Sequence, residues 1–172
     1  IREWPELKNT SLSNETELTP RTDYVVQGKD ECLVFMSVRT KDQFGTDRLF
    51  CMRTVDGGKT FKFVSWIVPP YDKKTADLSA KIKLYDDDAK NPHADECRAV
   101  MSKTISLNNG KLISAMRRRY NEHNWVDSYV SEDNGNSWKF LSEVGNAGAG
   151  NGNPPSLNIT DKGRLVAIFG NR

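Results

Sequence analysis

The sequence predicts an all-β fold built from repeated four-stranded units, which is the arrangement of a β-propeller. A short turn motif occurs twice, strand-like segments flank both copies, and a further pair of strand-like segments lies upstream of each copy. Two stretches of chain with the same order of strands indicate an internal structural repeat. Repeats of this kind are typical of propellers.

The turn motif has the pattern S/T-x-D-x-G-x-S/T-F/W, and residues 54–61 and 131–138 both match it. The hydroxyl and carboxylate groups cap backbone N–H groups, and the glycine permits a positive φ. We therefore expect a structural rather than a catalytic role for both copies, with the aromatic residues largely buried beneath the turns. The motif residues are Thr54, Asp56, Gly58 and Phe61 in the first copy and Ser131, Asp133, Gly135 and Trp138 in the second.

The spacing of the repeats predicts a single domain over residues 1–172 that is an incomplete propeller of about two and a half blades. The expected blades are residues 21–68, 98–144 and 153–172, the last of them incomplete, and residues 69–96 form a polar insertion between blades. Propellers close at about four to eight blades. We therefore expect either a further segment of chain or self-association to complete the ring.

Composition excludes several classes of partner. The chain has 25 Lys and Arg against 23 Asp and Glu, so its net charge of +2 gives no case for nucleic acid. It has no apolar run of transmembrane length. Three cysteines without paired spacing predict neither a disulfide framework nor a zinc site, and no glycine loop for phosphate is present. We expect no metal, cofactor, nucleic acid or membrane partner.

Arginines recur where the second strand of each unit ends, and others precede the first strands. In an antiparallel meander these positions lie at the opposite end from the turn motifs. Guanidinium groups that converge on one rim suit a planar anion such as a carboxylate. The alternative is that they are ordinary strand ends paired with Asp42, Asp47, Glu96, Glu122 and Asp127. The candidate anion-binding arginines are Arg21, Arg39, Arg98, Arg117, Arg119 and Arg172.

The turn motif is the Asp box, and the chain resembles bacterial sialidase-like (BNR/Asp-box) proteins over most of residues 21–172. The resemblance rests on the two boxes and on segments 96–98, 117–120 and 151–170. It implies a six-bladed propeller in which three arginines bind the substrate carboxylate, a Tyr/Glu pair supplies the nucleophile and an Asp is the acid/base. Arg21 resembles the first arginine of that triad, although Arg21-Thr22-Asp23 stands where the family has Arg-Ile-Pro.

By the same resemblance, Arg39 precedes the loop that carries the proton donor, so Asp42 or Asp47 is the candidate acid/base, and Asn153 joins the substrate-binding candidates. The implied function is a sialidase-like glycoside hydrolase, or a fragment of one, acting on a carboxylate-bearing sugar by a metal-independent retaining reaction. A secreted or periplasmic location is also implied. The alternative is a non-catalytic Asp-box propeller that binds glycans or proteins, and a third possibility is a structural scaffold.

Overall fold

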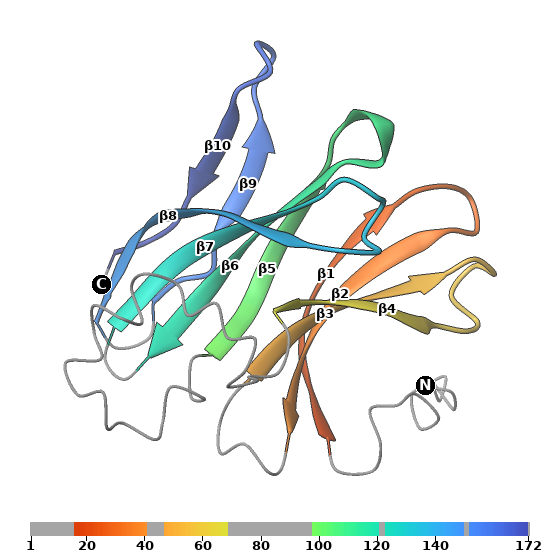
Figure 1. Cartoon of the computed structure of the whole chain (residues 1–172), viewed down its shortest axis with the longest axis horizontal. Helices are drawn as coiled ribbons and strands as arrows, with labels where there is room; N and C mark the ends of the chain where they lie inside the picture. The colour runs from red at the N-terminus through yellow and green to blue at the C-terminus, as the bar shows by residue number, and fades with distance from the viewer. Residues whose placement is uncertain (1–15, 41–46, 69–97, 121–122, 150–151, 172) are drawn as a thin grey trace.

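The computed structural model describes residues 16–40, 47–68, 98–120, 123–149 and 152–171, which form three antiparallel sheets that follow one another along the chain (Figure 1). In each sheet, strands that are consecutive in sequence are neighbours. The expectation of an all-β fold made of antiparallel sheets is confirmed. The described residues contain no helix that is long and apolar enough to cross a membrane.

Each of the first two sheets has four strands. The first sheet contains β1 (Thr16–Val26), β2 (Cys32–Thr40), β3 (Asp47–Thr54) and β4 (Lys62–Val68). The second sheet contains β5 (Arg98–Ser106), β6 (Leu112–Tyr120), β7 (His123–Ser131) and β8 (Lys139–Ala149), with a short 3₁₀ turn at Asn108–Gly110. A third unit is the hairpin of β9 (Ser156–Ile159) and β10 (Leu165–Ile168).

The first strand of the second sheet, β5, lies beside β1, β2 and β3 of the first sheet on one side and beside β9 of the third unit on the other. Both β1 and β5 contain a bulge. The register shifts between Thr19 and Asp23 in β1, and between Val100 and Lys103 in β5, where Met101 has a φ of 55°. A bulge interrupts the alternation of side chains from which strands are predicted, so the sequence analysis did not identify either bulge.

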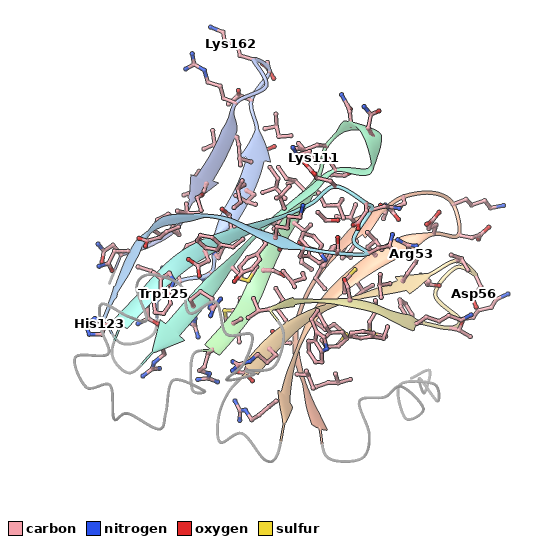
Figure 2. The ribbon with its side chains drawn as sticks, viewed as in Figure 1. Arg53, Asp56, Lys111, His123, Trp125 and Lys162 are labelled. Carbon is pink, nitrogen blue, oxygen red and sulfur yellow. The ribbon has the colours of Figure 1, made fainter. Side chains whose placement is uncertain are left out.

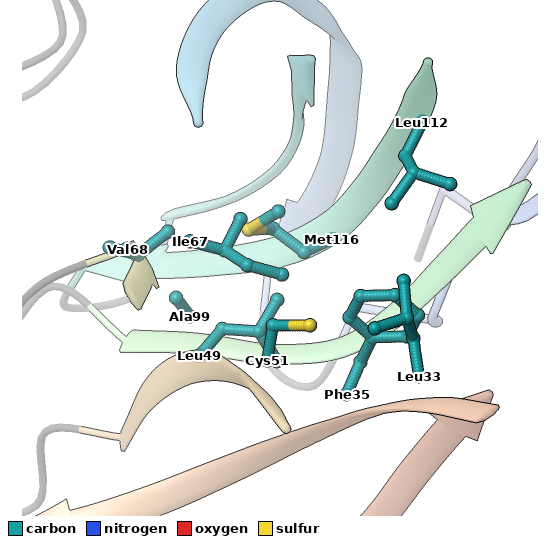
Figure 3. Packing of buried hydrophobic residues seen from close by; sticks show 9 residues of the cluster. All are labelled: Leu33, Phe35, Leu49, Cys51, Ile67, Val68, Ala99, Leu112 and Met116. Atoms are coloured by element: carbon teal, nitrogen blue, oxygen red, sulfur yellow. The ribbon is translucent and has the colours of Figure 1, made fainter. Parts of the chain in front are cut away.

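The main core lies between the first and second sheets. Strands alternate their side chains between two faces, and Leu33 and Phe35 of β2 point toward the second sheet. They pack with residues of both sheets in one cluster (Figure 3). Its buried members are Leu33, Phe35, Leu49, Cys51, Ile67, Val68, Ala99, Leu112 and Met116, with exposures of 0–7%.

Two further clusters use the remaining faces. Met36, Val38, Phe50 and Met52 lie on the face of the first sheet that points away from the second sheet. On the far face of the second sheet, Ile113, Ala115 and Val126 pack against Leu157, Ala167 and Phe169 of the third unit. Sheets are thus stacked on both faces of the second sheet.

Cysteines serve packing in the described part of the chain. Cys51 is fully buried in the main core, and burial raises the pKa of its thiol to about 12. Cys32 is half-buried, and both are free thiols. Cys97 lies outside the described residues.

Candidate functional site

Both Asp boxes form the same hydrogen-bonded turn. In the first box, the Thr54 hydroxyl donates to Asp56 Oδ1 (2.8 Å) and accepts from the Gly58 N–H (2.9 Å). In the second, the Ser131 hydroxyl donates to Asp133 Oδ1 (2.8 Å) and accepts from the Gly135 N–H (2.8 Å). The two residues after each aspartate have positive φ, at 72° and 84° in the first turn and 56° and 84° in the second.

The aspartates are held as anions by these turns. In the first box, the Thr60 hydroxyl donates to Asp56 Oδ2 at 2.6 Å, and this bond, with the Thr60 N–H, lowers the pKa of Asp56 well below its usual range. The Ser137 hydroxyl donates to Asp133 Oδ2, again at 2.6 Å, and this bond lowers the pKa of Asp133. Each carboxylate therefore serves as an acceptor for its own turn.

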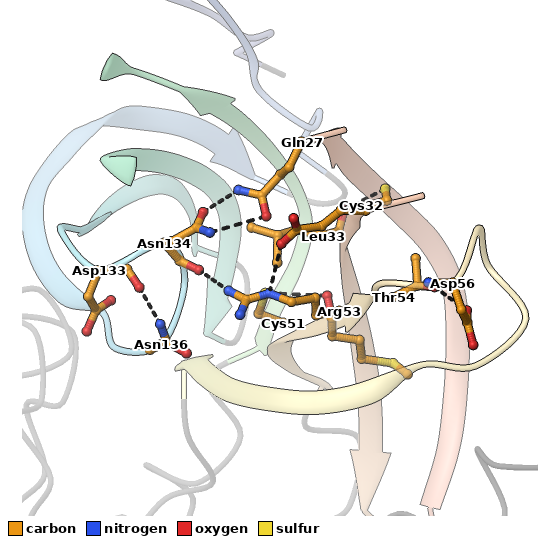
Figure 4. Close-up of polar contacts among 12 residues, drawn as sticks. Gln27, Cys32, Leu33, Cys51, Arg53, Thr54, Asp56, Asp133, Asn134 and Asn136 are labelled. Carbon is orange, nitrogen blue, oxygen red and sulfur yellow. Dashed lines mark hydrogen bonds and ion pairs between the residues drawn. The ribbon is translucent and has the colours of Figure 1, made fainter. Parts of the chain in front are cut away.

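The second Asp box also joins the two sheets (Figure 4). Arg53 of β3 donates from Nη2 to the Asn134 carbonyl at 2.6 Å. Ser65 of β4 donates to the Gly135 carbonyl at 2.5 Å. Trp138 Nε1 donates to the Ser65 hydroxyl at 3.2 Å, and its ring meets Phe35 edge-on at 6.1 Å between centroids. Phe61 and Trp138 are half-buried rather than largely buried, because each covers the margin of a core cluster.

The arginines lie at the other end of the sheets. In β2 and β3, Cys32 pairs with Thr54 at the Asp-box end, whereas Arg39 pairs with Asp47 at the opposite end. Figure 2 shows Asp56 and His123 far apart, at these two ends. We call the end marked by Arg39, Asp47, Arg98, Arg117, Arg118 and Arg119 the arginine end.

Register places two of the predicted arginines at equivalent positions. Arg39 stands seven residues after Cys32, the first residue of β2, and Arg119 stands seven residues after Leu112, the first residue of β6. Cys32 pairs with Thr54 and Leu112 pairs with Ser131, and Thr54 and Ser131 are the first residues of the two Asp boxes. The recurrence of arginine in the sequence therefore reflects a repeated place in the fold.

An ion-pair cluster links the two sheets at the arginine end. Arg98, the first residue of β5, donates from Nε (2.9 Å) and Nη2 (2.6 Å) to Asp47 Oδ2. Arg39 Nε lies 3.3 Å from Asp47 Oδ1. The Asp47 side chain is 1% exposed, against 37% for Arg39 and 28% for Arg98. The carboxylate is enclosed, whereas each of the two arginine side chains is about one-third exposed.

Neighbouring arginines of β6 point to opposite faces. Arg117 donates from Nη1 to the Gly152 carbonyl at 2.7 Å, toward the third unit. Arg118 lies 3.5 Å from Asp127 Oδ2, donates to the Tyr129 hydroxyl at 3.1 Å, and lies 5.9 Å from the centre of the Trp125 ring. The alternative of ordinary ion pairing therefore holds for Arg39 and Arg98 with Asp47 and for Arg118 with Asp127.

The structure leaves other predicted residues untested. Asp42, Arg172 and the insertion at residues 69–96 lie outside the described residues, as does the side chain of Arg21, whose backbone is in the β1 bulge. Asn153 is half-buried beside Gly170, a close approach that leaves no room for a side chain at Gly170. No cluster of three or more metal-ligating side chains is found in the described parts of the chain.

The sequence analysis did not include Arg118 among the candidate residues and did not predict the contacts of Asp23. Arg118 is buried with Asp127 and Trp125, and alternation along β6 and β7 would have placed all three on one face. Asp23 is a second missed contact, because it binds Lys103 Nζ (2.9 Å) and the Thr104 N–H across the sheet boundary. Nothing in the local sequence signals that contact.

The stacking of successive sheets, with first strands side by side and Asp boxes at one end, is that of consecutive blades of a β-propeller. No protein-family model matches the sequence, and no curated protein matches it. The fold is similar to the GH93 alpha-L-arabinofuranosidase of Fusarium graminearum in complex with arabinobiose, with a TM-score of 0.61, 16% identity, and coverage of 87% of this chain and 39% of that chain.

A mutant of the alpha-L-arabinofuranosidase arb93a from Fusarium graminearum, in complex with an iminosugar inhibitor, is also similar, with a TM-score of 0.52 and 12% identity. That match covers 90% of this chain and 38% of the other. The chain thus spans about two-fifths of the length of these structures. At such identities the likeness shows a shared propeller fold.

Proposed function

We propose that the chain is part of a propeller glycoside hydrolase of the sialidase-like type, which acts on a sugar that carries a carboxylate. Its fold is similar to that of a solved glycosidase. The arginine end supplies the chemistry that would recognise the acidic group of the sugar. Specificity for a carboxylate distinguishes this proposal from a propeller that takes neutral sugars.

The observation that carries the proposal is the charge balance at the boundary between the first and second sheets. Among the described residues there, three arginines form ion pairs with only two aspartates, which leaves an excess positive charge. The arginines are Arg39, Arg98 and Arg118, and the aspartates are Asp47 and Asp127. Arg39 and Arg98 are about one-third exposed, and a guanidinium carries more N–H donors than Asp47 uses. A ligand carboxylate would complete the balance with charge-assisted hydrogen bonds.

In this proposal Asp42 is the proton donor and Asp47 is not, because Asp47 is enclosed by two arginines and a glycosidic oxygen would not reach it. A retaining reaction also needs a nucleophile on the other face of the sugar ring. The proposal assigns no described residue to that role. The reaction as proposed uses no metal ion.

The second candidate is a propeller that binds an acidic glycan without cleaving it. Within the described residues, the enclosure of Asp47 leaves no candidate acid/base in contact with solvent, so these residues by themselves support binding of a sugar rather than its cleavage. The two candidates share the carboxylate-binding site. They differ in whether the bound sugar is turned over.

Calorimetric titration of the intact protein tests the proposal. The probes are N-acetylneuraminic acid, glucuronic acid, the methyl ester of glucuronic acid and arabinobiose, and release of a chromogenic aglycone from the matching glycosides measures turnover. We expect the free acids to bind at least about tenfold more tightly than the neutral ester, which corresponds to one charge-assisted contact. Equal affinity for acid and ester, or selective binding of arabinobiose, would contradict the carboxylate site.

A further inference from the structure

Asp47 occupies a place that no other described carboxylate shares. It begins β3, pairs in register with Arg39 of the neighbouring strand, and is hydrogen-bonded to Arg98 of the next sheet. One carboxylate therefore contacts two arginines that come from different sheets. These arginines are 59 residues apart in sequence.

The contacts with Asp47 fix the orientation of Arg98. Two nitrogens of its guanidinium, Nε and Nη2, bind the same oxygen, at 2.9 and 2.6 Å. This edge-on contact fixes the plane of the guanidinium and turns its remaining N–H groups away from Asp47. The other oxygen of Asp47 lies 3.3 Å from Arg39.

An arginine side chain that is mobile before binding loses rotamer freedom when it receives a ligand, and this loss weakens binding. An arginine already held by a buried carboxylate has lost that freedom on folding. Two cations on one anion also keep a net positive charge that attracts an anionic ligand. Asp47 is thus hydrogen-bonded to Arg98 and ion-paired with Arg39, and one negative charge faces two positive charges.

We propose that Asp47 is a positioning residue that holds Arg39 and Arg98 as one receptor for the sugar carboxylate, with the receptor straddling the first and second sheets. This inference rests on the proposed function. It adds that the carboxylate site is shared between two blades and depends on a residue that does not touch the sugar. The rival explanation is that Asp47 only joins the sheets.

The test compares Asp47→Asn with a matched variant, Asp23→Asn. Asp23 is also a buried aspartate (8% exposed) that contacts the second sheet, through Lys103 and Thr104. Asp23 pairs with Phe35 of β2. Phe35 lies four residues before Arg39 on that strand, so Asp23 is about 13 Å from the arginine end. Both variants weaken the joint between the sheets, and only Asp47→Asn releases the two arginines.

Titration of each intact variant with glucuronic acid and with its methyl ester separates positioning from stability. We expect Asp47→Asn to weaken binding of the acid by about tenfold, the scale of one charge-assisted contact, and to leave binding of the ester unchanged. Asp23→Asn should change neither, and Asp47→Glu should recover part of the loss. A thermal melt of each variant checks that it is folded at the titration temperature.

Arg98→Lys is an independent variant that keeps the charge and a contact with Asp47 but removes the planar fork, and it should also weaken binding of the acid alone. Equal losses for acid and ester, or equal losses in Asp47→Asn and Asp23→Asn, would show that Asp47 only joins the sheets. If the wild-type protein does not prefer the acid, the proposed function itself fails. If it does and both Asp47→Asn and Arg98→Lys bind the acid as well as wild type, the positioning inference fails.

Discussion

At the scale of single residues, the hydroxyl and carboxyl groups of the Asp boxes form hydrogen bonds within their own turns, whereas Trp138 contacts the neighbouring sheet. Trp138 caps the main core and donates its indole N–H to Ser65 of the first sheet. Phe61, at the same place in the first box, packs on the other face of the first sheet and has no N–H to donate. The aromatic residue of the motif thus packs on a different cluster in each Asp box.

We expect Trp138→Phe to lower the free energy of unfolding by about 1 kcal/mol, the usual net value of a lost hydrogen bond, because the ring still packs on Phe35. Ser65→Ala removes the partner hydroxyl. In a double-mutant cycle measured by urea denaturation, the two changes should couple by about 1 kcal/mol. A coupling of zero would show that the indole N–H contributes nothing to the joint.

The Asp boxes also predict a pH dependence. Hydrogen bonds from Ser137 lower the pKa of Asp133, so its folded value lies below its unfolded value of about 3.9. A depressed pKa gives stability that is present above about pH 4 and is lost as pH falls toward the folded value. Asp133→Asn should therefore be less stable than wild type at pH 7 and should lose less stability on acidification to about pH 2.5.

Urea denaturation at the two pH values measures this difference. Glu132→Gln is the control, because it removes one negative charge from the exposed neighbouring position, outside the hydrogen bonds of the turn. A parallel fall in stability for wild type and Asp133→Asn would rule out the turn as the source of the acid sensitivity.

At the scale of elements, the joints between sheets differ at their two ends. The first and second sheets are joined by an aromatic and backbone contacts at the Asp-box end, and by ion pairs at the arginine end. The second sheet and the third unit meet through the segment that follows β8. There the Gly152 carbonyl accepts from the buried Arg117, and the backbone passes close to Asn124 and Ala147.

Gly152→Ala tests this close approach. A Cβ at Gly152 would lie 3.0 Å from the Cβ of Asn124 and 3.1 Å from the Cβ of Ala147, so the segment would have to shift away from Arg117. We expect a loss of about 1–3 kcal/mol in the free energy of unfolding. Gly28→Ala is the control, since its new Cβ would come no closer than 3.9 Å to Glu31 and its effect should be within about 0.5 kcal/mol of zero. Equal effects would refute the packing argument.

At the scale of the whole molecule, the described sheets leave apolar side chains exposed on two outward faces. Val26 of the first sheet is 65% exposed, and Ile168 of the third unit is 70% exposed. Ile168 lies three residues after the first paired residue of β10, and Phe35 lies three residues after the first paired residue of β2, so the two positions are equivalent. Phe35 is buried against the next sheet. We propose that further sheets, from more chain or from another copy, cover these faces.

We therefore expect the 172-residue chain on its own to associate as its concentration rises, which light scattering coupled to size exclusion would measure. Ile168→Lys together with Val26→Lys should shift the chain toward the monomer, because a charge disfavours burial of each face. Val55→Lys is the control, since Val55 is 66% exposed in the first Asp-box turn and not on either face. A chain that stays monomeric at all concentrations would contradict this expectation.

The sequence by itself determined the repeated antiparallel strands, the two Asp-box turns and the recurrence of arginine at one strand end. These features depend on local chemistry: turn geometry requires particular residues at fixed spacing, and side-chain alternation marks strands. Arg39 and Arg119 were thus placed at one end of the sheets before any contact was known. The bulges of β1 and β5 escaped detection because they break the alternation.

Only the tertiary structure decided which side chains meet across the sheet boundaries. That Asp47 contacts Arg98, that Asp23 contacts Lys103 and that Trp138 reaches Ser65 depends on how one sheet stacks on the next. Those partners lie between 51 and 80 residues apart, and no local pattern pairs them. The ion pairs of Asp47, a proton-donor candidate by sequence, with Arg39 and Arg98 likewise appear only in the structure, because burial and ion pairing are properties of the stacked sheets.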